Sequence, residues 1–336
     1  MRQGNIELLR ITSIILIVIL HADLFSLSAP DYNRLMTSPF VSITQLAVES
    51  IAICSVNIFI FISGWFGVRP TVKSFSNLCF QILYFTIGIY LATILLGVNT
   101  INLSGILSII FLTNNGWFIR SYVLLLILVP ILNSYIINAN RLHFKWLLIF
   151  FFLFQTIYGW LFDVAKFFNN GYSTISFIGI YLLARYIKLY QPNFSKFKGY
   201  YDLTIFILLS ILLTILTIYP VYLSNGYRIW QLFAYNNPIV ILMSVFLFLF
   251  FTKLKFNNQF IIKLASSSFA IYLLHCNPNI MNEYFVRPIK YFYQNFDGVE
   301  SLGYISLIVI IYIVAAIILD IPRKYIWNKY LLPKFK

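Results

Sequence analysis

The sequence predicts an all-α polytopic membrane protein, a bundle of about ten transmembrane helices. Of its 336 residues, 60% are hydrophobic and only 10% are charged, whereas an average soluble domain carries about 25% charged residues. Its apolar runs are long and continuous, close to the roughly 20 residues with which a helix crosses a bilayer, and they lack the alternation of barrel strands. Because only helices and closed barrels span lipid, the chain is expected to be helical, and a soluble domain is excluded.

Ten apolar runs define the expected spans, and every connection between them is short. These runs lie at 11–29, 46–66, 78–98, 116–138, 145–162, 172–189, 202–223, 236–252, 264–282 and 302–322. The apolar piece 103–112 is too short to cross and is expected to be interfacial or re-entrant. The amino terminus shows no signal-peptide cleavage site, so its run is read as the first true span. We expect one transmembrane domain over 1–336 without a soluble domain.

The basic residues orient this bundle. With the amino terminus inside, the predicted inner segments hold three times as many of the 24 Lys and Arg residues as the outer ones, as expected for cytoplasmic loops. The sequence thus predicts an N-in, C-in topology. The same bias, with attraction to anionic membrane lipids, explains the net charge of +14 without a nucleic-acid partner. The three cysteines are isolated and no metal-binding motif is present, so no metal is expected.

The first span carries the most informative ionisable residues. Glu7-Leu-Leu-Arg10 is followed, after ten residues, by His21-Ala-Asp23. Eleven residues at 100° each end about 20° beyond three full turns, so Arg10 and His21 are expected on one helix face, roughly 16 Å apart along the axis. A cation at the inner mouth and a deep imidazole suit an extended anionic cofactor. Alternatively, Arg10 is a topology anchor and His21 a packed interface residue.

The second span ends in small and basic residues. In Phe61-Ile-Ser63-Gly64-Trp-Phe, the small residues allow either close helix approach or an exposed backbone amide. Arg69 and Lys73 follow and return positive charge to the inner mouth. The alternative is a helix end with ordinary basic flanks.

Two later segments place polar residues toward the outer side. Trp117 and Arg120 open the fourth span, and Tyr272-Leu-Leu-His275 lies in the ninth. The depth of His275 is comparable to that of His21, so the two imidazoles are expected to converge on one cavity. A tryptophan at this level is also typical of an ordinary interfacial belt.

Taken in order, these segments resemble the acyltransferase-3 family of membrane acyltransferases, which acylate bacterial surface glycans and related molecules. The resemblance rests on Arg10 with His21 after ten residues, on Phe-Ile-Ser63-Gly64-Trp-Phe, on Trp117-Phe118 with Pro130 and Asn133 downstream, and on Tyr272-Leu-Leu-His275. It covers nearly the whole chain, since the family core is ten helices. Many members have a Gly after the Arg, where this chain has Ile11. Many also carry a soluble extension, which is not expected within residues 1–336.

The resemblance implies acyl-CoA, commonly acetyl-CoA, as a cytoplasmic donor, and a hydroxyl acceptor that is usually a sugar. It implies His21 as the essential base, and Arg10 and Arg69 match basic positions that handle the donor. The expected location is the bacterial cytoplasmic membrane, with a surface polysaccharide or glycolipid precursor as acceptor.

The residues themselves support a consistent division of roles. His21 and Arg10 are the expected catalytic pair, and the acceptor side is expected to be shaped by Trp117, Arg120, His275 and Tyr272. The donor is expected to be bound by Arg10, Arg69, Lys73, Ser63 and Gly64. The alternative is a transporter or flippase for a glycan or anionic lipid, which also needs intramembrane cations but forms no covalent product.

Overall fold

The computed structural model describes residues 3–111 and 116–335, and helices make up 83% of these described residues. No strand occurs within these described ranges. The chain divides into two compact units, each built from two separate stretches. Unit 1 comprises Met1–Arg69 and Ser121–Ile261, and unit 2 comprises Pro70–Arg120 and Ile262–Lys336. The all-helical class is confirmed, and the single domain over 1–336 stays a prediction.

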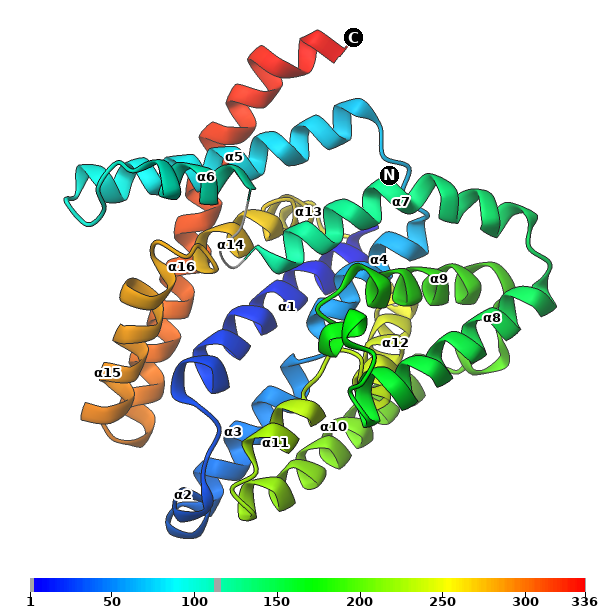
Figure 1. Cartoon of the computed structure of the whole chain (residues 1–336), viewed down its shortest axis with the longest axis horizontal. Coiled ribbons are helices and arrows are strands. Elements are labelled where there is room, and N and C mark those ends of the chain that lie inside the picture. The colour runs from blue at the N-terminus through cyan, green and yellow to red at the C-terminus, as the bar shows by residue number, and fades with distance from the viewer. Residues whose placement is uncertain (1–2, 112–115, 336) are drawn as a thin grey trace. The chain divides into compact units, whose positions relative to one another are not determined.

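Unit 1 holds the first helices of the chain and most of its middle (Figure 1). Its elements are α1 (Gly4–Leu20), η1 (His21–Phe25), α2 (Tyr32–Thr37), α3 (Pro39–Ala52), α4 (Ser55–Phe66), most of α7 (Trp117–Asn138), α8 (Arg141–Phe154), η2 (Gln155–Leu161), η3 (Lys166–Gly171), α9 (Thr174–Tyr190), η4 (Asn193–Lys196), α10 (Gly199–Tyr222), α11 (Gly226–Leu232) and α12 (Pro238–Lys253).

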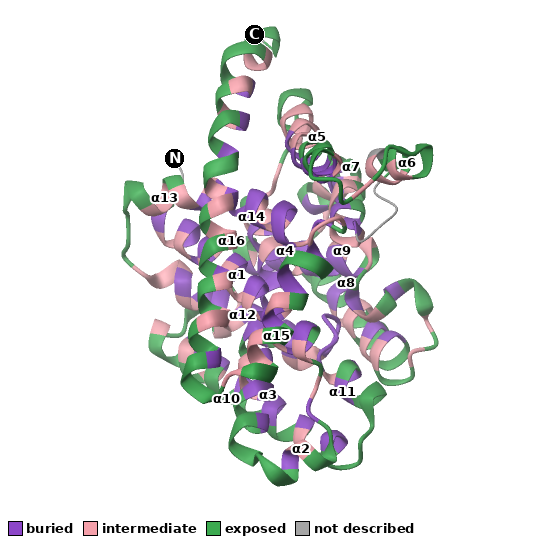
Figure 2. Cartoon of the chain, turned by 90° about the vertical axis from the view of Figure 1, so that its left-hand side faces the viewer, coloured by how far each residue is buried: buried purple, intermediate pink, exposed green. Residues whose placement is uncertain are grey.

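The centre of unit 1 is α4, which packs against α1, α9 and α12. Figure 2 shows buried residues gathered on α1, α4 and α12. Ile58 and Phe61 of α4, Leu9 and Val18 of α1 and Phe248 of α12 have no solvent exposure. Burial of this kind on all sides of α4 holds the first helix in one position, and both residues of the predicted catalytic pair sit on that first helix.

Unit 2 contains the helices that follow Arg69 and the carboxy-terminal helices. Its elements are α5 (Val72–Leu95), α6 (Leu103–Phe111), the first turn of α7, the end of α13 (Gln259–Ala265), α14 (Ser268–His275), η5 (Met281–Val286), α15 (Arg287–Asn295), α16 (Gly298–Ile326), η6 (Trp327–Leu331) and η7 (Leu332–Phe335). α14 packs against α5 and α16.

Within the described residues, seven helices are long and apolar enough to cross a membrane. They span Gly4–Phe25, Pro39–Phe66, Val72–Leu95, Trp117–Asn138, Arg141–Leu161, Gly199–Tyr222 and Gly298–Phe335. Seven of the ten expected spans therefore have a long apolar helix, and the N-in, C-in topology stays a prediction. Large apolar side chains on α16, such as Leu307, Ile310 and Ile318, are exposed, as expected of a surface that faces lipid.

The remaining three spans are shorter than the sequence suggests. α9 has 17 residues and α12 has 16, which gives about 25 Å of helix against a hydrocarbon core of about 30 Å. The expected ninth span, 264–282, is broken after α14 because Pro278 lacks a backbone N–H and cannot continue the helix. α6, with nine residues, is as short as the sequence predicts for this segment.

Candidate active site

The first predicted catalytic residue, Arg10, lies on α1, and the second, His21, is the cap residue that follows this helix. The α-helical hydrogen bonding runs from Gly4 to Leu20, and His21 keeps right-handed helical dihedrals as the cap residue. The helical spacing that puts Arg10 and His21 on one face therefore holds along the whole interval. Both side chains are half-buried, whereas Leu9, Ile11, Leu20 and other neighbours are buried. Arg10 lies in the second turn of the helix, because the helix begins at Gly4 rather than at residue 11.

Arg10 belongs to a polar group that joins three helices of unit 1. Its Nη1 lies 3.5 Å from Oε2 of Glu7, whose side chain is almost fully buried. Arg10 also interacts electrostatically with the Tyr122 hydroxyl on α7. That hydroxyl lies 3.0 Å from Oγ of Ser63 on α4. The structure thus brings Arg10 into one cluster with Ser63 and Tyr122, and the binding of the donor by this cluster stays a prediction.

Gly64 sits where α4 crosses α9. A Cβ built on it would lie 2.5 Å from the Tyr181 carbonyl oxygen and 2.8 Å from Cβ of Ala184, so only glycine permits this approach. Of the two readings that the sequence left open, close helix packing is the one that this geometry supports. The backbone of Gly64 faces α9, and its expected contact with the donor stays a prediction.

The carboxyl end of α4 is held by side chains from α7 and α9. Gly67 ends the helix in the left-handed conformation with φ of 59°, and the Arg185 guanidinium lies against it, since Nη1 would be 2.6 Å from an added Cβ. Asn133 Nδ2 donates to the Val68 carbonyl at 3.1 Å. The Tyr181 hydroxyl donates to Asn133 Oδ1 at 2.8 Å. We call these five residues the α4-end cluster.

The other two basic residues predicted for the donor side are exposed. Arg69 follows the end of α4 in unit 1, and Lys73 lies in the first turn of α5 in unit 2. Thr71 caps that helix with its side chain. Arg10 belongs to unit 1 and Lys73 to unit 2, and a site shared by the two residues stays a prediction.

In unit 2 the residues predicted for the acceptor side form an aromatic group. The rings of Trp117 and Phe118 pack edge to face at 5.9 Å, and Phe118 lies 5.3 Å from Tyr272. Arg120 is exposed and interacts electrostatically with the Tyr272 hydroxyl. A cavity of about 50 Å³ is lined by Tyr272, Cys276, Gly116 and neighbouring residues. A cavity of this size holds water rather than a sugar.

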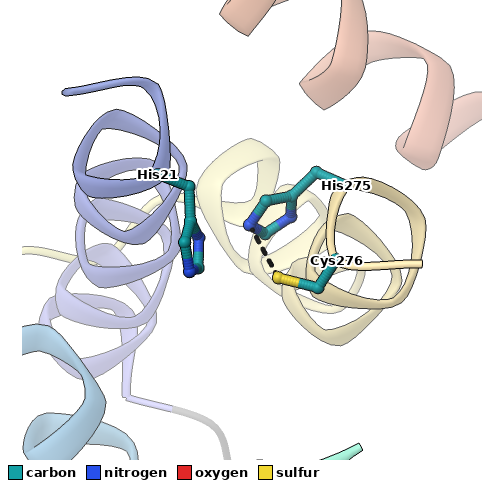
Figure 3. Close-up of side chains that lie close together, drawn as sticks. All are labelled: His21, His275 and Cys276. Carbon is teal, nitrogen blue, oxygen red and sulfur yellow. Dashed lines mark hydrogen bonds between the residues drawn. The ribbon is translucent and has the colours of Figure 1, made fainter. Parts of the chain in front are cut away.

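His275 lies at the end of α14 next to Cys276 (Figure 3), and it is fully buried. Its Nδ1 lies 2.6 Å from the Ile271 carbonyl oxygen and must donate, because a carbonyl only accepts. Its Nε2 then accepts from the Cys276 thiol at 3.2 Å. These two bonds fix the ring within unit 2. His21 belongs to unit 1, so the expected convergence of the two imidazoles stays a prediction.

Several polar residues of unit 1 escaped the sequence reasoning. Arg185 is one of the basic residues of the predicted inner segments, and no motif of the sequence points to Tyr181. Asn133 is part of the family resemblance. Asp23, Gln45 and Glu49 are polar side chains within apolar helices, and that placement alone marks them as candidates.

Comparison with known families gives one result over nearly the whole chain. A family model described as an acyltransferase domain matches residues 3–321. Comparisons with curated proteins and with solved structures give no match. The matched range includes the Arg10–His21 pair, the α4-end cluster and the α14 histidine, and it confirms the resemblance that these motifs carried. The chain belongs to the acyltransferase-3 family.

Proposed function

We propose that the protein is a membrane-embedded O-acyltransferase that moves an acetyl group from acetyl-CoA to a hydroxyl of a cell-surface polysaccharide or glycolipid precursor. Family membership makes it an acyltransferase, and its apolar helices make it a multi-pass membrane protein. The observation that carries the finer proposal is the placement of Arg10 and His21 on one face of α1. The proposed location is the cytoplasmic membrane of a bacterium.

The donor side is assigned to the basic residues near the start of α1 and the end of α4. Guanidinium groups bind phosphate through charge-assisted hydrogen bonds, and Arg10 is oriented for this by Glu7. Ser63 and Tyr122 supply hydroxyl groups beside it. Arg69 and Lys73 add exposed positive charge along the chain after α4. These donors fit the phosphates of acetyl-CoA, and the roughly 16 Å between Arg10 and His21 suits its extended arm.

The chemistry is assigned to His21. Its imidazole accepts the proton of the acceptor hydroxyl as that oxygen bonds to the thioester carbonyl carbon. When the carbon–sulfur bond breaks, His21 returns the proton to the departing thiolate, so protons and charges balance. A positioned general base contributes roughly 10²–10⁴-fold in rate. Trp117, Arg120, Tyr272 and His275 remain proposed residues of the acceptor side.

A deletion strain complemented with defined variants tests this function. We expect acetyl esters on surface glycans, measured by NMR, to disappear in the deletion strain and to return with the wild-type protein. With His21→Ala they should fall by at least about 100-fold. His143→Ala is the matched control, because His143 is exposed at the start of α8 and should restore acetylation fully.

Two outcomes contradict the proposal. Unchanged acetyl content in the deletion strain would refute the acetyl and glycan assignment. Full acetylation by a well-expressed, folded His21→Ala variant would refute the role of His21. No observation on this protein favours the transporter alternative.

A further inference from the structure

Three buried side-chain oxygen atoms on η1 and α3 of unit 1 have no hydrogen-bond partner. They are Oδ2 of Asp23, Oε1 of Gln45 and Oε2 of Glu49. Glu49 is 1% exposed and Gln45 is 6% exposed. Asp23 links the three side chains, because the Gln45 side chain forms a hydrogen bond with its carboxylate and its charge acts on Glu49. Buried polar atoms are normally satisfied, so three orphans in one place require an explanation.

The cluster of Asp23, Gln45 and Glu49 is tied to His21 through the backbone. α1 gives way at His21 to the π-helical segment η1, which contains Asp23. Ser26 Oγ donates to the His21 carbonyl at 2.6 Å and closes this turn. π-helical turns within helices are frequently found at functional sites. The orphan acceptors therefore begin two residues after the proposed base, on the same turn of chain.

Aromatic rings border the cluster. Glu49 interacts electrostatically with Tyr172, whose ring lies 4.8 Å from that of Tyr235. Asn57 Nδ2 holds the Tyr235 backbone by donating to its carbonyl at 2.9 Å. Tyr172 is 37% exposed and Asp23 is half-buried, so the cluster has an edge toward the surface of unit 1.

The chemistry of this cluster is that of a hydroxyl receptor. Carboxylate and amide oxygens accept hydrogen bonds, and each of the three side chains has one such oxygen without a donor. Rings beside them offer flat apolar faces for C–H groups. A cation would also suit two carboxylates, but Arg34 already places positive charge on Asp23 and opposes a second cation.

We infer that Asp23, Gln45 and Glu49, with Tyr172 and Tyr235 as an aromatic wall, bind the hydroxyl groups of a sugar unit of the acceptor. The inference rests on the proposed function, because it presupposes a glycan acceptor. Hydroxyl groups donate to the three orphan acceptors while the ring face of the sugar lies against the tyrosines. One hydroxyl of the bound unit is then presented to His21. Acceptor recognition is thus placed in unit 1, in addition to the unit 2 residues that the sequence suggests.

Steady-state kinetics on the purified full chain in lipid nanodiscs test this site. The donor is acetyl-CoA, the acceptor is a glycolipid extract from the deletion strain, and released CoA thiol is measured. We expect Glu49→Gln, Gln45→Ala and Asp23→Asn each to raise the KM for the extract by about tenfold or more. The KM for acetyl-CoA should stay within about twofold. Glu300→Gln, which alters an exposed carboxylate on α16, should leave both KM values unchanged.

The outcomes separate this inference from the proposed function. If the wild-type protein releases no CoA with any extract, the proposed function fails. If it turns over and all three variants keep the wild-type KM for the extract, the inference fails while the function stands. Equal rises in both KM values, or a higher unfolding temperature with Mg²⁺ or Ca²⁺ alone in wild type but not in Glu49→Gln, would also overturn it. The three variants lie on two elements, so a folding defect in one leaves the others as tests.

Discussion

Two groups of carboxylates, Asp320 in unit 2 and Asp23 with Glu49 in unit 1, differ in how their oxygens are partnered. In unit 2, Asp320 on α16 is fully buried, and each of its oxygens has a cationic partner: Arg323 Nη2 at 2.7 Å from Oδ1 and Lys324 Nζ at 2.9 Å from Oδ2. Lys324 donates further to Ser266 and Ser267, both at 2.7 Å. In unit 1, Glu49 is buried and Asp23 is half-buried, and each has one buried oxygen without a hydrogen-bond partner. A buried carboxylate held by two cations stabilises a fold, whereas neighbouring carboxylate and amide oxygens that lack donors are candidates for binding.

The largest effect on stability is expected in the paired network of unit 2. Asp320→Ala leaves the Arg323 guanidinium, which is 5% exposed, buried without its carboxylate. Removing one partner of a buried pair costs about 3–5 kcal/mol. We expect a marked fall in the unfolding temperature in detergent, measured by intrinsic fluorescence. Asp297→Ala, an exposed residue before α16 without a side-chain cap bond, is the control, and equal stability of the two variants would refute the comparison.

A second comparison concerns how tightly helices pack in the two units. Gly64→Ala on α4 forces a Cβ against backbone and side-chain atoms of α9 at 2.5–2.8 Å. Overpacking of this kind costs about 1–3 kcal/mol. Gly303→Ala on α16 meets no atom within 4 Å, so better helix propensity should leave stability unchanged or raise it by about 0.5–1 kcal/mol. Thermal unfolding measures both, and similar losses would show that α16 is as closely packed as α4.

Periodicity explains what the sequence could predict. The relation between Arg10 and His21 follows from a single regular helix, and the apolar runs identify most long helices. The break at Pro278 was also readable, because proline removes a donor and the preceding Asn277 favours a turn. The lengths of α9 and α12 depend on where neighbouring loops pack, and the apolar residues of one segment do not show this packing.

The parts of the site that escaped prediction come from contacts between helices. Asp23 and Glu49 lie on different elements. The sequence of neither segment shows that their carboxylates interact electrostatically. The same holds for Tyr181 and Asn133, whose hydrogen bond joins α9 to α7. For Gly64 the sequence offered two roles, and only the position of Tyr181 distinguishes between them. Chemistry within one helix is predictable from spacing, whereas chemistry shared by helices needs their packing.

The smallest effect is expected at the α4-end cluster. Removing one hydroxyl there tests whether the cluster affects stability alone or donor binding as well. Tyr181→Phe keeps a fully buried ring but removes the bond to Asn133, which in turn holds the Val68 carbonyl. Such a bond contributes about 0.5–1.5 kcal/mol, so we expect a small fall in the unfolding temperature. We also expect a rise in the KM for acetyl-CoA, because the end of α4 leads into Arg69. Tyr312→Phe in unit 2, where the ring packs on Phe285 at 5.0 Å, is the control. If Tyr181→Phe and Tyr312→Phe have the same KM for acetyl-CoA, the α4-end cluster contributes to stability alone. Donor binding in unit 1 then rests on Arg10 and its partners.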